Sequence, residues 1–319
     1  MKKIVLLLTV FFLSMGAFAQ ESRMFVAPGR ETFFAFPSEI LGDKYTLTVF
    51  LPTEVAPISK HYPVIYFIGL DRSDREKFQQ FAQKNNVFLA GLFIPEEELE
   101  SVSDKLTDFI GTEWVPYMDT NYATEASPSS RILAIRGEVG VRGAVEAFKA
   151  GNFGALSLLN PGTDLPEFLL QPFQRVYVKG TQEELAAANG LLDEKATYGE
   201  QYALDYADYE TGWLDGLNMK YLQARPQDLK VKKITMQLGS KALVATSGKS
   251  TSLQVYASLA NGLKTVVIPQ NVRTSPPFLD WQAPLGMLRV RDGAETGPIT
   301  IKINVDAVES SAKIMLKKQ

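Results

Sequence analysis

The chain is organised around a short apolar stretch, a glycine-containing turn and a run of small residues between Arg131 and Ala147. The apolar stretch predicts a buried strand. Gly137 and Gly140 supply the conformational freedom that a tight turn needs. Gly143 and Ala144 follow where a helix would pack closely on its neighbours. The sequence therefore predicts a strand, a turn and a helix in direct succession.

Strand and helix patterns alternate on both sides of this unit. Strands buried on both faces of a parallel sheet are almost wholly apolar, as Tyr62 to Ile68 is. Alternation over this length predicts βαβ units and an α/β fold, a mostly parallel sheet with helices on both faces. The strands are expected at 45–52, 62–68, 87–94, 155–159, 175–178 and 201–206, and the helices at 71–84, 106–118 and 213–222.

The pattern changes after Ala224–Asp228. Short alternating strands then follow at close spacing, and Asn261-Gly262 and Asp292-Gly293 are turn signals between them. This predicts a small all-β sandwich of immunoglobulin-like size over residues 229–319. The larger α/β domain is expected over residues 20–225.

Residues 1–19 have the pattern of a secretory signal peptide: Lys2 and Lys3, an apolar run, and Ala17-Phe-Ala19. The apolar run is shorter than the ~20 residues of a spanning helix, so cleavage near Ala19 is favoured over a membrane anchor. The mature chain is expected to be periplasmic or extracellular, with no membrane span. The absence of cysteine excludes disulfides and a thiol nucleophile. The net charge of −3, without a basic block, argues against nucleic-acid binding.

Several segments together resemble the esterase family of α/β-hydrolases that includes esterase D-like and feruloyl-esterase-like enzymes. The resemblance covers about residues 36–222, and the tail resembles a bacterial Ig-like domain through 253–258, 277–281, 286–290 and 297–301. The family segments are Ser38–Gly42, Thr48–Pro52, Tyr62–Tyr66, Trp114–Tyr122 and Phe153–Pro161.

The resemblance implies a serine, an acid and a histidine in that chain order, with the serine in a Gly-x-Ser-x-Gly turn. This chain departs from the pattern at each position. Gly137 stands where the nucleophile belongs, and Glu183 or Glu184 follows the strand that precedes the acid. Glu210 or a neighbour stands in place of the histidine. Gly69-Leu70 replaces the His-Gly or Asp-Gly pair that the family has after its early strand.

The chain contains one histidine, His61, far upstream of the position that the fold gives to the base. Without an imidazole near an alcohol, general-base activation at neutral pH is lost. No cofactor and no metal site are expected, because the available ligands are carboxylates without EF-hand spacing. A carboxylate pair drawn from Glu138, Glu183 and Glu210 remains an open alternative for glycoside chemistry.

Arg136, Glu138 and Arg142 are charged residues on or beside the turn that lines the cleft in this fold. Two interpretations stay open: they bind a polar ligand, or they pair with each other across the vacated site. Mutual pairing is favoured, because most surface charges have structural or solvating roles.

These observations favour an exported, non-catalytic esterase-like protein, a binding or scaffold module whose partner is another envelope protein or a glycan. One alternative is a secreted carboxylic-ester hydrolase with an unconventional site, built on Ser157 or on a serine in Ser127–Ser130. Another is a carbohydrate-binding protein of the cell envelope. Fold alone does not choose among them.

Overall fold

The structure is a computed structural model that describes residues 32–42, 45–52, 60–69, 75–167, 169–192, 196–208 and 211–318. The expected signal peptide at 1–19, Leu70 and Glu210 lie outside these residues. Within the described residues, no helix is both long and apolar enough to cross a membrane.

Eight strands of the first 206 residues lie in the order β1-β2-β4-β3-β5-β6-β7-β8. Strands β4, β3, β5, β6, β7 and β8 run parallel to their neighbours, whereas β1 and β2 are antiparallel to theirs. This is the strand order of an α/β-hydrolase sheet. The strands are β1 (Thr32–Ala35), β2 (Thr46–Phe50), β3 (Val64–Ile68), β4 (Phe88–Phe93), β5 (Arg131–Arg136), β6 (Ala155–Leu159), β7 (Arg175–Gly180) and β8 (Tyr202–Tyr206).

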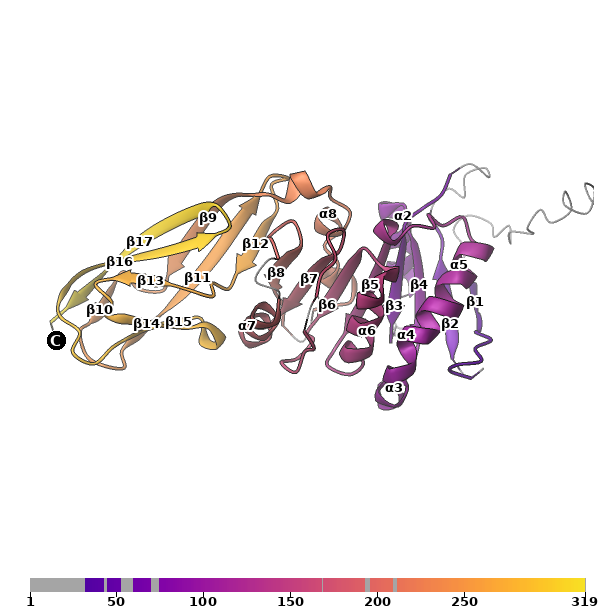
Figure 1. The fold of residues 1–319 in the computed structure, drawn as a ribbon, viewed down its shortest axis with the longest axis horizontal. Coiled ribbons are helices and arrows are strands. Elements are labelled where there is room, and N and C mark those ends of the chain that lie inside the picture. The colour runs from indigo at the N-terminus through magenta and orange to yellow at the C-terminus, as the bar shows by residue number, and fades with distance from the viewer. Residues whose placement is uncertain are drawn as a thin grey trace, which may run out of the picture.

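Helices cover both faces of this sheet, as two adjacent residues of β3 demonstrate. The Tyr66 ring packs edge-on against Trp114 on one face, and the Phe67 ring packs against Phe78 and Trp213 on the other. Successive side chains of a strand point to opposite faces, so one strand supplies both cores. The helices are α2 (Arg75–Asn85), α3 (Glu96–Val102), α4 (Leu106–Phe109), α5 (Val115–Asn121), α6 (Val141–Ala147), α7 (Gln182–Leu191) and α8 (Met219–Leu222) (Figure 1).

The C-terminal part is a sandwich of two sheets. In β16 the residues Ile299, Ile301 and Ile303 are buried and alternate with more exposed neighbours, which is the pattern of a strand with one face in a core. Four strands form one sheet in the order β10-β17-β16-β13. The strands are β9 (Val231–Leu238), β10 (Ala242–Val244), β11 (Ser250–Leu259), β12 (Lys264–Val267), β13 (Arg273–Ser275), β14 (Leu279–Gln282), β15 (Met287–Val290), β16 (Gly297–Val305) and β17 (Val308–Lys317).

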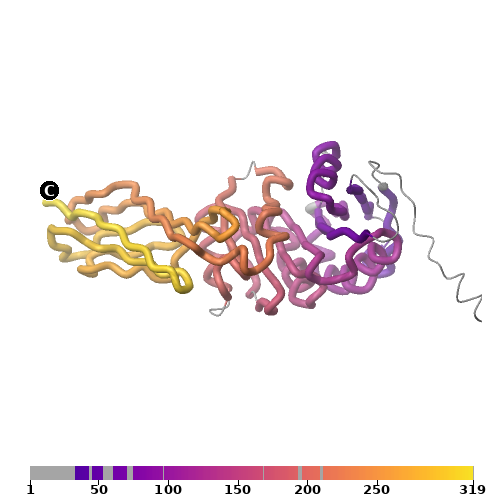
Figure 2. Tube along the Cα trace, turned by 90° about the horizontal axis from the view of Figure 1, so that it is seen from above, coloured from indigo at the N-terminus to yellow at the C-terminus, as the bar shows by residue number. Residues whose placement is uncertain are grey.

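The other sheet of the sandwich continues the large sheet. Strand β12 lies antiparallel beside β8, with Val266 opposite Leu204, and β11 follows β12. The described strands therefore include a 13-stranded mixed sheet that runs through both parts. The prediction of a mostly parallel sheet is confirmed only for the six strands β4, β3, β5, β6, β7 and β8. The molecule is elongated as a result, with the sandwich extending from the β8 edge (Figure 2).

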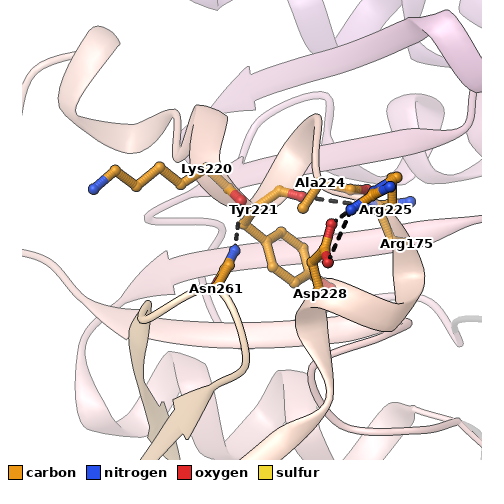
Figure 3. A network of polar contacts seen from close by, with 7 residues as sticks. All are labelled: Arg175, Lys220, Tyr221, Ala224, Arg225, Asp228 and Asn261. Carbon is orange, nitrogen blue, oxygen red and sulfur yellow. Dashed lines mark hydrogen bonds and ion pairs between the residues drawn. The ribbon is translucent and has the colours of Figure 1, made fainter.

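Polar contacts fix the connection between the two parts, close to α8 (Figure 3). Arg175 at the start of β7 donates to the carbonyls of Tyr221 and Ala224 at 3.2 and 2.5 Å. Asn261, in the turn between β11 and β12, donates to the Lys220 carbonyl at 3.0 Å. The connecting residues are held from both sides.

The strands expected from the sequence between residues 45 and 206 are present with shifts of a few residues at their ends. The helix expected at 213–222 is instead a short 3₁₀ turn, Leu214–Gly216, followed by α8. Gly212, Gly216 and Asn218 interrupt the helical pattern there. The short strands β1, β10, β13 and β14 were not expected, because three or four residues give little periodicity.

Candidate functional site

The predicted strand, turn and helix are present as β5, residues 137–140 and α6. Gly137 has φ +82° and Gly140, which precedes α6, has φ +80°. The N–H of Gly137 donates to the Leu159 carbonyl at 2.9 Å, which ties the turn to the end of β6. The turn thus lies at the carboxyl end of the parallel strands, where α/β-hydrolases hold the nucleophile.

Gly137 contributes no side chain to this position. A β-carbon at Gly137 would meet no heavy atom of the described structure within 4 Å. At Gly140 the same atom would come within 2.8 Å of Leu99, so that glycine is required by packing as well as by its φ. Among the described residues, the nucleophile position thus has room for a side chain that the sequence does not supply.

The two expected acid positions differ in their surroundings. Glu183 is exposed at the start of α7. Glu184 is 3% exposed, and its carboxylate accepts from the N–H groups of Gly162 and Thr181 at 2.9 and 2.7 Å. Thr181 accepts in turn from the Glu184 N–H, which completes a capping box. Glu184 therefore acts as a structural connector between the loop after β6 and the helix after β7.

The loop after β8 is also held by backbone contacts. Asn160, after β6, donates from Nδ2 to the Asp208 carbonyl at 2.9 Å, and Ala207 donates to the Gly180 carbonyl at 2.9 Å. Asn160 is 5% exposed and has φ +47°. The loops after β6, β7 and β8 are thus bound to each other at the rim of the expected site.

The sequence contained a signal for one of these connections. Thr181 and Glu184 have the Thr-x-x-Glu spacing of a capping box. The hydrogen bond from the Gly162 N–H to the Glu184 carboxylate depends on the fold and has no signature in the sequence. Asn160 carried no signal of its role, because its partner lies 48 residues away.

His61 lies at the amino end of β3, just before Tyr62, and is exposed. Gly137 follows the carboxyl end of β5, and Ile68 pairs with Ile135 in the register of these strands. A strand rises about 3.3 Å per residue, so His61 and the turn at Gly137 lie more than about 20 Å apart. His61 and Gly137 therefore do not belong to one site.

Two of the three charged residues of the turn contact the neighbouring loop. Arg142 forms its ion pair with Asp164, at 3.8 Å between two side chains that are 65% and 97% exposed. Glu138 lies over the next loop, because a β-carbon on Gly162 would come within 2.4 Å of its Cγ. Arg136 is exposed at the end of β5. Arg142 and Glu138 thus have contacts of their own along the rim, and the mutual pairing of Arg136, Glu138 and Arg142 stays a prediction.

The serines considered as alternative nucleophiles lie elsewhere. Ser157 is 3% exposed within β6, and its hydroxyl donates to the Gly216 carbonyl at 3.3 Å. Ser127 and Ser129 share a hydrogen bond at 2.8 Å in the turn before β5, at the opposite end of that strand from Gly137. His61 precedes β3 and lies at the same end of the sheet as Ser127 and Ser129, because Val64 pairs with Arg131 and Tyr62 bridges to Thr124. Neither His61 nor these serines lie at the Gly137 turn.

Two carboxylates that could serve as cation ligands accept hydrogen bonds from tyrosine hydroxyls. Asp205 accepts from the Tyr177 hydroxyl at 2.9 Å, and Glu98 accepts from the Tyr45 hydroxyl at 2.9 Å. Within the described part of the chain, no three His, Cys, Asp or Glu side chains form a group that would hold a metal ion. Burial raises the pKa of Tyr206, near the same rim, to about 12, so its phenol stays protonated at neutral pH.

No family model and no curated protein matches this sequence. In fold, 104 chains of solved structures match. An IroE-like serine hydrolase from Shewanella oneidensis is 13% identical, with 61% of this chain and 79% of that chain covered and a TM-score of 0.42. S-formylglutathione hydrolase from Staphylococcus aureus is 12% identical, with 60% and 95% covered and a TM-score of 0.41.

Ferric enterobactin esterase from Salmonella typhimurium is 13% identical, with 57% of this chain and 56% of that chain covered and a TM-score of 0.45. These proteins are similar to this chain in fold, and no residue role is taken from them. The α/β-hydrolase-like architecture stands on the strand order and on the turn at Gly137.

Proposed function

We propose that this protein is an exported binding or scaffold module built on an esterase-type fold, and that it does not hydrolyse esters. The observation that carries the proposal is the turn at Gly137. It has the position and the positive φ of a nucleophile turn, and it has no side chain there. A scaffold that keeps this turn without its alcohol has lost the group that attacks the ester.

The surroundings of the turn support the proposal. The carboxylate of Glu184 holds two backbone N–H groups, and Asn160 holds the Asp208 carbonyl. Groups bound in this way position loops and are not available to hold a base. The lone histidine, His61, lies at the other end of the strands. The partner is expected to be a glycan or another envelope protein.

Two measurements on the purified protein test the absence of hydrolysis. We expect 4-nitrophenyl acetate to be hydrolysed at the buffer rate, and an alkyl fluorophosphonate probe to leave the protein unlabelled, while an active serine esterase reacts in parallel. The variants Ser157→Ala, Ser127→Ala, Ser129→Ala and Ser130→Ala cover the alternative serines. Labelling that any one of these substitutions abolishes, together with saturable hydrolysis, would overturn the proposal.

Export is tested separately. The signal-peptide pattern predicts a mature chain that starts at Gln20. Intact-mass measurement of the protein recovered from a periplasmic or culture fraction checks this start. Recovery of the full-length chain with Met1 from the cytosol alone would contradict export and would leave the question of hydrolysis untouched.

A further inference from the structure

A cavity lies where the sandwich meets the α/β part, far from the turn at Gly137. It has a volume of about 360 Å³ and is partly open to solvent. One wall comes from the end of α7 and the start of β8, and the other from β13, β16 and β17. Small-molecule sites have volumes of about 300–1,000 Å³ and occur preferentially at such junctions. The cavity faces the amino end of β8, whereas the turn at Gly137 lies at the carboxyl ends of the strands.

The first wall presents an aromatic ring. Tyr198 is 2% exposed and donates its hydroxyl into the core, to Thr265 Oγ1 at 2.9 Å. Its ring meets that of Tyr202 edge to face, with centroids 5.0 Å apart. Tyr202 is held in this way and is half-buried, and its hydroxyl makes no hydrogen bond to another described residue. A fixed ring with an unused hydroxyl lines the cavity.

The second wall is the outward face of the four-stranded sheet. Arg273 lies opposite Lys302, and Asn304 lies opposite Glu309, so these four side chains share one face. Asn304, Arg273 and the nearby Asn271 make no side-chain hydrogen bonds to other described residues. Their donors and acceptors converge on the cavity without being consumed by the fold.

The charges of the described residues that line the cavity balance. Arg273 and Lys302 are cationic, and Asp306 and Glu309 are carboxylates. Lys302 and Glu309 already approach each other to 3.4 Å. An anionic ligand would meet the carboxylates, and a cationic ligand would meet the guanidinium and the ammonium. The balance favours a neutral ligand that is bound through hydrogen bonds.

We propose that this junction cavity is a binding site for a neutral, polyhydroxylated ligand of the size of a mono- or disaccharide. Amide side chains donate and accept at once, which matches hydroxyl groups that do the same. The Tyr202 ring offers an apolar surface for the C–H face of a sugar ring, with its hydroxyl available as a polar contact. The use of the cavity rests on the proposed function, since a working esterase would bind its substrate at the Gly137 turn.

The test is saturation-transfer NMR and calorimetric titration of the full chain with cellobiose, maltose and N,N′-diacetylchitobiose, guided by a glycan array. We expect at least one of these probes to bind. Asn304→Ala should weaken binding by up to about tenfold, the loss of one hydrogen bond to the ligand. Tyr202→Phe should weaken it by a smaller factor because the ring remains.

Thr300→Ala is the matched control, because Thr300 lies on the same strand and face outside the cavity. It should bind within twofold of the unmodified chain. Circular dichroism checks that each variant is folded. Absence of binding by all three probes and by the array, or binding that Asn304→Ala and Tyr202→Phe both leave unchanged, would overturn the inference. The ester assay is read separately, so hydrolysis would overturn the proposed function without deciding the fate of the cavity.

Discussion

The buried carboxylate of Glu184 accepts a hydrogen bond from the N–H of Gly162, 22 residues earlier in the chain, at 2.9 Å. Its second oxygen accepts from the Thr181 N–H at 2.7 Å. We therefore expect Glu184→Gln to lower the free energy of unfolding by about 1–3 kcal/mol, because an amide NH₂ would face one of these donors. Urea titration followed by tryptophan fluorescence measures the change.

The neighbouring Glu183 provides the control for this prediction. It is exposed on the same helix turn, so Glu183→Gln should change stability by no more than about 0.5 kcal/mol. Equal effects of the two substitutions would show that the contact to Gly162 does not stabilise the rim.

Substitutions at Gly137 and Gly140 allow the cost of backbone strain to be compared with the cost of a steric clash. Both have φ near +80°, but only Gly140 lacks room for a β-carbon. We expect Gly137→Ser to cost about 1–2 kcal/mol, the penalty of the left-handed conformation, and to fold. Gly140→Ala should cost clearly more, because Leu99 must move as well. Thermal unfolding of the two variants makes the comparison.

The Gly137→Ser variant also tests the chemistry. It restores an alcohol at the turn, but His61 remains more than about 20 Å away by strand geometry. We expect hydrolysis of 4-nitrophenyl acetate to stay at the buffer rate. Saturable hydrolysis by this variant would mean that another side chain serves as the base, and the rim would need a different account.

The sequence was sufficient for the central strands and for the turn at Gly137, because apolar runs and glycines have local causes. The continuation of the sheet across β8 and β12 was not predictable, since the single residue pair Val266–Leu204 has no local signature. The same holds for the contact between Glu184 and Gly162. Both depend on which loops the fold brings together.

For the candidate site, the sequence predicts which catalytic groups are missing and does not predict a new function. A missing alcohol and a single histidine can be counted in a sequence. The junction cavity joins Tyr202 on β8 to Asn304 on β16, about a hundred residues later, and Asn304 belongs to an ordinary alternating strand. The sequence predicts that the Asn304 side chain faces outward. Only the fold shows that Tyr202 lies on the other wall of the same cavity.

Asp306 predicts a pH dependence of stability. Desolvation raises the pKa of the Asp306 carboxyl above its usual 3.8, and the negative charge of Glu200 raises it further. The hydrogen bond from the Tyr198 N–H lowers this pKa by a smaller amount. The folded state then binds more protons than the unfolded state between the two pKa values, so this residue makes stability fall as pH rises through that window. Asp306→Asn removes the effect and suits the φ of +50°, which Asn tolerates well.

The measurement for Asp306 is the difference in unfolding free energy between Asp306→Asn and the unmodified chain from pH 3 to pH 7. We expect the variant to gain relative stability as pH rises from below about 3.8, and to keep that gain at neutral pH. A difference that is constant with pH would contradict the raised pKa. The exposed Asp292→Asn, in another turn, is measured in parallel as the control for the same change of side chain.

The shared sheet and core predict that the two parts unfold together. Leu204 and Val266 are both buried, and the buried residues form one cluster that extends from the α/β part into the sandwich. Asn189 on α7 adds a buried hydrogen bond to the Ile268 carbonyl at 2.9 Å. We expect one calorimetric transition for the chain, and Asn189→Ala should lower its midpoint without splitting it, because a buried carbonyl loses its partner at a cost of about 1–3 kcal/mol. Two separate transitions in the unmodified chain would mean that β12 covers the edge of β8 without coupling the sandwich to the α/β sheet.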